Sequence, residues 1–171
     1  MDKIYLLHGA NGVGKTYILK EIFGVPHDEH YTHTGLMRGY CEPKIKNNIL
    51  WFPEWRWRCS NKMLNSELVN YITKTIREFE GDVILDVSHR RKKIIEYDWN
   101  KEVVNLVLYA TEEEIKERNG SRGKARKDSP KTKEETAMRA FNETINLVNR
   151  FGSKLTQEQL YEKIIIQHGL D

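Results

Sequence analysis

The chain has 171 residues, of which 39% are hydrophobic and 31% are charged, and its formal net charge is +3. This length suits one domain with one core, the lack of a long apolar run excludes a membrane-spanning protein, and the small net charge does not by itself indicate a polyanionic partner. The two cysteines, Cys41 and Cys59, form no C-x-x-C pair, and the start MDKIYLLHG is too short and too polar for a signal peptide, so we expect a cytoplasmic protein.

Short apolar segments, typical of buried strands, alternate along the chain with segments of helical periodicity. This alternation predicts an α/β fold with a parallel sheet. Short apolar runs predict strands at residues 3–8, 48–53, 82–88 and 103–110. Amphipathic spacing predicts helices at residues 15–23, 66–79, 111–119, 133–151 and 157–167. Capping boxes at Thr111, Thr132 and Thr156 support the starts of the last three helices. Apart from the strand at 48–53, residues 24–62 are expected to be irregular.

The stretch GANGVGKT, from Gly9 to Thr16, matches the P-loop pattern G-x-x-x-x-G-K-[ST] between a predicted strand and a predicted helix. Its glycines allow backbone N–H groups to turn around an anion, and the N-terminus of the helix adds its dipole. Lys15 should reach the β- and γ-phosphates, and the Thr16 hydroxyl should bind Mg²⁺. We therefore expect a nucleoside triphosphate to be bound by Gly9, Ala10, Asn11, Gly12, Val13, Gly14, Lys15, Thr16 and Tyr17.

Asp86, in the strand VILDVS, is the expected second contact for Mg²⁺, because an acid near the end of a buried strand can face the phosphates. The alternative is an aspartate that caps the next turn. The chain lacks the N-K-x-D motif by which GTPases read the base, and it is too short for additional motor domains. These features favour a small kinase, with a single P-loop kinase domain over residues 1–171.

A basic segment between the predicted helices 111–119 and 133–151 is the candidate lid, at about residues 118–131. Like charges at this density must be solvated or neutralised by an anion, and in a kinase the natural anion is the triphosphate. Arg122 is the first candidate to spread the charge of the γ-phosphate in the transition state, and Arg118 is the second. The alternative is a solvated loop.

The P-loop, VILDVS and the stretch RNGSRG at 118–123 together resemble the kinase domain of phage polynucleotide kinases, which carry an R-N-x-x-R-G lid in the same order. The resemblance extends to zeta-type toxins and to kinases of hydroxymethylated DNA bases. It implies a three-layer P-loop NTPase (nucleoside kinase-like) fold with a parallel central sheet and a basic helical lid. It also implies ATP and Mg²⁺ as cofactors, Arg122 as lid arginine, and transfer of the γ-phosphate to a nucleic-acid hydroxyl, either a 5′-hydroxyl or a hydroxymethyl base. A virus-encoded origin, with action in the host cytoplasm, stays open.

The chain departs from that family at the acceptor side, where the family has D-x-x-R with the Asp as general base. Arg38 matches the arginine, but residue 35 is glycine. The base is therefore Asp28, Glu42 or Glu54, or none is needed because the acceptor is already a phosphate. The stretch THTGLMRGYCE is similar to part of the guanylate kinases, although the first arginine of their pattern is missing.

Two further stretches are candidates for acceptor binding. WFPEWRWRCSNK interleaves tryptophan with arginine, and its Trp55 and Arg56 suit a base and a phosphate. SHRRKK follows Asp86, so His89 and Arg90 are expected at the edge of the sheet that carries the P-loop. The alternatives are tryptophans that cover the core and a solvated start of a helix. A kinase of free nucleotides or small metabolites, or a non-catalytic nucleotide-binding regulator, remains open, as does the oligomeric state.

Overall fold

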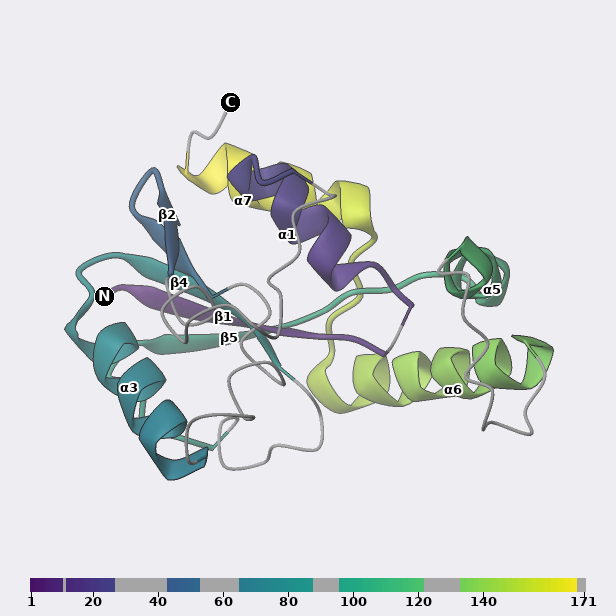
Figure 1. Cartoon of the computed structure of the whole chain (residues 1–171), viewed down its shortest axis with the longest axis horizontal. Coiled ribbons are helices and arrows are strands. Elements are labelled where there is room, and N and C mark those ends of the chain that lie inside the picture. Colours follow the sequence, from purple (N-terminus) through teal and green to yellow (C-terminus); the bar gives the residue numbers. More distant parts are fainter. Residues whose placement is uncertain (11, 27–42, 53–64, 88–95, 122–132, 169–171) are drawn as a thin grey trace, which may run out of the picture.

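The computed structural model describes residues 1–10, 12–26, 43–52, 65–87, 96–121 and 133–168, which form a sheet with helices on both faces (Figure 1). Its elements are β1 (Lys3–His8), α1 (Lys15–Phe23), β2 (Lys44–Lys46), β3 (Ile49–Trp51), α3 (Asn65–Glu78), β4 (Asp82–Val87), β5 (Glu102–Val107), α5 (Glu112–Ser121), α6 (Lys133–Phe151) and α7 (Gln157–His168). The expected α/β fold is therefore confirmed.

The sheet has five strands in the order β2-β3-β4-β1-β5. β1 lies between β4 and β5 and pairs with both in parallel, with Leu7 beside Asp86 and His8 beside Val107. Beyond β5, Leu155 continues the sheet by a single bridge to Leu108, which brings the segment before α7 to this edge. The carboxyl end of β1 therefore lies between those of β4 and β5. Open α/β sheets bind ligands just beyond the carboxyl ends of their strands.

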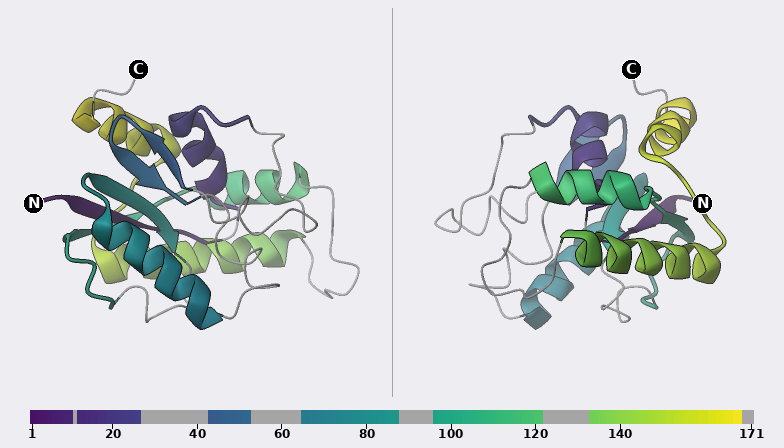
Figure 2. Two further views of the ribbon diagram at one scale, coloured as in Figure 1. Left: turned by 60° about the vertical axis from the view of Figure 1, so that its left-hand side comes forward. Right: turned by 90° about the vertical axis from the view of Figure 1, so that its right-hand side faces the viewer.

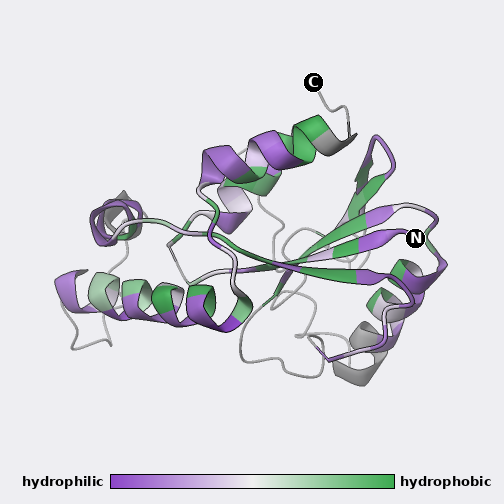
Figure 3. Ribbon diagram, turned by 180° about the vertical axis from the view of Figure 1, so that it is seen from behind, coloured by the Kyte–Doolittle hydropathy of each residue, from purple (hydrophilic) through white to green (hydrophobic). Residues whose placement is uncertain are grey.

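The helices form two layers around the sheet (Figure 2). α1 and α7 lie side by side on one face and α3 covers the other, while α5 packs against α6. Successive residues of β1 point to opposite faces, so Leu7 joins the core under α1 and Leu6 joins the core under α3. Burial on both faces explains why β1 reads as one continuous apolar run. Hydrophobic residues accordingly follow the strands, and the hydrophilic ones gather on the outer sides of the helices (Figure 3).

Most predicted elements lie where the sequence placed them, but β2 corrects the expectation of an irregular segment. β2 pairs with β3 in antiparallel fashion, so the sheet is mostly and not entirely parallel. Asn47 and Asn48 join the two strands with φ angles of 46° and 64°. Positive φ at both central residues is typical of a tight hairpin turn, and asparagine tolerates it better than most residues.

Two of the predicted capping boxes, those at Thr111 and Thr156, are confirmed. The Thr111 N–H donates to Glu114 Oε1 (3.1 Å), and the Glu114 N–H donates to Thr111 Oγ1 (3.2 Å). Thr156 and Gln159 make the same reciprocal pair at the start of α7. Thr132, the third predicted cap, lies outside the described residues. α5 contains Arg118, as predicted, and ends at Ser121 rather than at residue 119.

The two valines at the second position of β4 and β5 test this core. Val83 is fully buried, whereas Val103 is 40% exposed. We expect Val83→Ala to lower the free energy of unfolding by about 2.5 kcal/mol, because the lost methyl groups leave a cavity. Val103→Ala should lower it by less than about 1 kcal/mol. Urea unfolding measures both losses, and equal losses would contradict the assignment of Val83 as buried and Val103 as exposed.

Candidate nucleotide-binding site

The predicted P-loop lies where β1 ends and α1 begins. Its backbone turns through left-handed conformations, with φ of 90° at Gly12 and 89° at Gly14, and the Val13 N–H donates to the Ala10 carbonyl (3.3 Å). At Gly14 a Cβ atom would also overlap the side-chain amide of Gln157. Glycine is therefore favoured at Gly14 by the backbone angle, and a Cβ atom there would also displace the Gln157 amide. Asn11 lies outside the described residues.

Lys15 lies inside the loop and is only 7% exposed. Its Nζ donates a hydrogen bond to the Gly9 carbonyl (2.8 Å), so the first and last parts of the loop are joined by this side chain. An ammonium group has three N–H donors, and a phosphate oxygen can be bound next to that carbonyl. The position is consistent with the role predicted for Lys15.

Thr16 and Asp86 are the predicted magnesium contacts. Thr16 is partly buried in the first turn of α1, and Asp86 is 3% exposed on the strand beside β1. Asp86 is two residues from Ile84, which belongs to the core under α1, and alternation places both side chains on that face. A hydroxyl and a carboxylate are oxygen donors that suit Mg²⁺, so these residues fit the ion. No cluster of three or more His, Cys, Asp or Glu side chains that could hold a metal occurs among the described residues.

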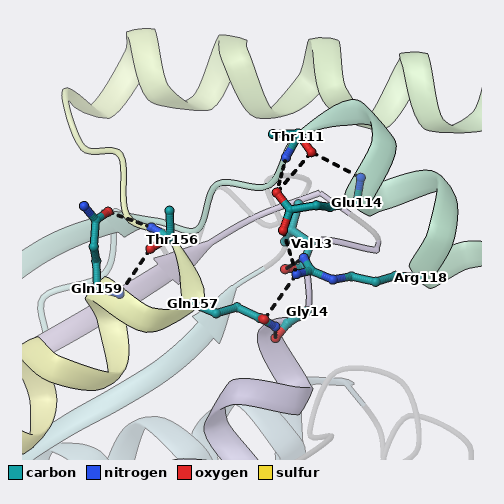
Figure 4. Close-up of polar contacts among 8 residues, drawn as sticks. All are labelled: Val13, Gly14, Thr111, Glu114, Arg118, Thr156, Gln157 and Gln159. Atoms are coloured by element: carbon teal, nitrogen blue, oxygen red, sulfur yellow. Dashed lines mark hydrogen bonds and ion pairs between the residues drawn. The ribbon is translucent and has the colours of Figure 1, made fainter.

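Arg118 reaches the P-loop from α5 (Figure 4). Its Nη1 donates to the Val13 carbonyl (2.8 Å), and its Nη2 pairs with Glu114 Oε2 (3.2 Å) and donates to Gln157 Oε1 (3.2 Å). Gln157 in turn donates from Nε2 to the Gly14 carbonyl (3.0 Å). The guanidinium group therefore lies against the Val13 carbonyl oxygen of the loop, and Gln157 lies against that of Gly14.

Sequence reasoning missed Glu114 and Gln157 as parts of this site. The spacing of Glu114 and Arg118, four residues apart on one helix, was a usable signal for their ion pair. Gln157 had no local signal, because 143 residues separate it from its partner Gly14.

His8, the last residue of β1, directly precedes the loop, and its ring is buried and neutral. It is fully buried, its Nε2 pairs with Asn105 Oδ1 (2.8 Å), and it stacks on Phe151 with ring centroids 4.0 Å apart. Burial is the largest cause that lowers the pKa of His8 from 6.5 to about 4; the hydrogen bond to Asn105 opposes it, and the charges of Lys15 and Arg150 lower the pKa further. The ring is thus uncharged near neutral pH.

The remaining predicted residues are only partly placed. Tyr17 is 54% exposed on α1. The others lie outside the described residues: Arg38, Trp55, Arg56, His89, Arg90, Arg122, and the candidate bases Asp28, Glu42 and Glu54.

Comparison with known proteins supports the fold. No family model and no curated protein matches this chain. Among solved structures, the tunicamycin resistance protein of Deinococcus radiodurans is similar, with a TM-score of 0.53 and 17% identity over 100% of this chain and 98% of that one. At this identity the likeness shows the fold alone: the chain has a P-loop kinase-like fold. No helix in the described part of the chain is both long and apolar enough to cross a membrane.

The low pKa of His8 predicts a loss of stability in acid. The unfolded chain binds a proton at His8 below about pH 6.5 and the folded chain only below about pH 4, so stability falls as the pH drops through this interval, by up to about 3 kcal/mol. His8→Gln keeps an N–H group for Asn105 but does not titrate. Urea unfolding at about pH 7.5 and about pH 4.5 should show a smaller pH effect in the variant.

Subtracting the pH effect on the stability of the variant from that of the wild type removes the contribution of the other titrating groups. One of these is Glu114, whose pKa is lowered chiefly by the hydrogen bond from the Thr111 backbone. An equal loss of stability in both proteins would show that His8 does not titrate as its burial indicates.

Proposed function

We propose that this chain is an ATP-dependent phosphotransferase of the P-loop kinase type. The observation that carries the proposal is the loop itself, with left-handed glycines at Gly12 and Gly14 and the Lys15 ammonium group held against the Gly9 carbonyl. Such a loop presents backbone N–H groups and one cation to the phosphates of a nucleotide. Its place in a P-loop kinase-like fold is consistent with this activity.

The residues of the chain divide the work as follows. Backbone N–H groups of the loop bind the phosphate oxygens, and Lys15 stabilises the charge that develops on the β- and γ-phosphates. Thr16 and Asp86 would hold Mg²⁺, which when bound neutralises and orients the phosphates. Arg122, by the resemblance of RNGSRG to known lids, would close over the γ-phosphate.

For the acceptor, we propose a hydroxyl on a nucleic acid, as a 5′-hydroxyl or a hydroxymethyl base. The support is in the sequence: the R-N-x-x-R-G stretch and the tryptophans and arginines of residues 51–62. Aromatic faces stack on bases, and arginines contact phosphates.

A small-molecule acceptor, including a free nucleotide, is the second candidate. A structural neighbour that matches this chain over its whole length is named for resistance to tunicamycin, which makes a small acceptor worth testing.

Lys15→Met tests the phosphotransferase itself. Loss of one positioned cation from the transition state should lower kcat at least about 100-fold, and it should also weaken ATP binding. Lys74, exposed on α3, offers a matched control, and Lys74→Met should leave both values unchanged. Transfer of label from γ-labelled ATP measures the activity, and calorimetry with Mg²⁺ measures binding. Binding of neither ATP nor GTP by the wild type would refute the proposal.

Arg122→Ala tests the lid. We expect a fall in kcat of about 100-fold or more with a smaller effect on ATP affinity, because the arginine acts mainly on charge that develops during transfer. Unchanged turnover in this variant would remove the lid assignment and favour a nucleotide-binding regulator.

A panel of acceptors decides between the two candidate substrates. It contains a 5′-hydroxyl oligonucleotide, hydroxymethylated DNA, nucleoside monophosphates and tunicamycin. We expect label on the nucleic acids. Label on a monomer alone would contradict the proposed acceptor and leave the phosphotransferase intact.

A further inference from the structure

The peptide groups on either side of Gly14 are hydrogen-bonded from outside the loop. Because a trans peptide group is planar, its C=O and N–H point in opposite directions. The Val13 carbonyl shares a peptide group with the Gly14 N–H, and the Gly14 carbonyl shares one with the Lys15 N–H. Whatever holds these two carbonyls therefore also sets the direction of these two N–H groups.

Each carbonyl is held by a side chain from a different helix. Arg118 of α5 donates to Val13 (2.8 Å), and Gln157 of α7 donates to Gly14 (3.0 Å). The Gly14 carbonyl also accepts the Ile18 N–H (3.1 Å), the first hydrogen bond of α1. Both side chains are themselves joined, because Gln157 Oε1 accepts from Arg118 Nη2 (3.2 Å).

We propose that Gln157 and Arg118 are positioning residues that orient the Gly14 and Lys15 N–H groups toward the phosphates of the nucleotide. The inference rests on the proposed function and deepens it. A donor on a carbonyl oxygen also polarises the peptide group, so its N–H becomes a stronger donor to an anion. The charge of Arg118 makes this effect larger at Val13.

Gln157 suits this task because an amide both donates and accepts. Its NH₂ group binds the loop while its oxygen accepts from Arg118. A methionine of similar length can do neither.

Glu114 fixes the other end of the arrangement. Its Oε1 accepts from the Thr111 backbone and hydroxyl, while its Oε2 pairs with Arg118. The hydrogen bond from the Thr111 backbone is the largest cause that lowers the pKa of Glu114, so it remains a carboxylate near neutral pH. The capping box of α5 therefore orients the guanidinium group that contacts the P-loop.

The test is the binding of ATP and of inorganic tripolyphosphate, with Mg²⁺ present, to Gln157→Met. Loss of one hydrogen bond to the loop should weaken both ligands by the same factor, about tenfold. Gln167→Met is the matched control, because Gln167 lies on the same helix ten residues beyond Gln157 and outside the capping box of Thr156 and Gln159. This control should bind both ligands as the wild type does.

Two results would overturn the inference. Equal affinities of Gln157→Met and Gln167→Met would show that the contact does not order the loop. Weaker binding of ATP with unchanged binding of tripolyphosphate would show that Gln157 acts on the nucleoside and not on the phosphate-binding peptides.

Glu114→Gln is a second variant that keeps the capping box, in which glutamine replaces glutamate without loss, but removes the charge that holds Arg118. We expect about threefold weaker binding of both ligands, because an exposed ion pair contributes less than the hydrogen bond to the loop. Glu113→Gln, exposed at the neighbouring position, is its control, and equal affinities of these two variants would also count against the inference.

Failure of this inference is distinguishable from failure of the proposed function. If the wild type binds neither triphosphate ligand, the proposed function itself fails. If the wild type binds both and Gln157→Met binds them equally well, the phosphotransferase stands and the positioning role is refuted.

Discussion

The left-handed turn at Gly14 is the constraint on which the other features of the site depend. It lies between β1 and α1, and Gln157 and Arg118 both lie against it. A side chain at this position would strain the backbone and displace the Gln157 amide at the same time. The absence of a Cβ atom at Gly14 therefore permits both the turn and the close approach of α5 and α7.

The two cations at the loop, Lys15 and Arg118, both have hydrogen-bond partners, whereas the nearby His8 ring carries no charge near neutral pH. Lys15 is buried against a carbonyl, and Arg118 is paired with both an acid and carbonyl oxygen. His8, directly beneath, is kept neutral by burial. A positive charge on His8 would be repelled by Lys15, so the neutral form of the ring is the more stable one in the folded chain.

The fold brings these groups together by its strand order. β1 lies between β4 and β5, and the three strands are parallel. The P-loop, Asp86 and the segment that leads to α5 therefore lie at the same end of the sheet, at the carboxyl ends of these strands. The bridge between Leu108 and Leu155 then directs α7 back to the same edge. The strand order thus gathers the loop, Asp86 and the starts of α5 and α7 at one end of the sheet.

The glycine-rich loop, the main elements and the capping boxes at Thr111 and Thr156 were determined by the sequence alone, because each depends on residues close together in the chain. The hairpin of β2 and β3 was missed, since β2 is short and polar and its pairing depends on a turn with two left-handed asparagines. Only the tertiary structure decided where Arg118 and Gln157 point. Their partners at Val13 and Gly14 are 105 and 143 residues away. No local pattern records such a contact, because it exists only after the sheet has brought α5 and α7 to the end of β1.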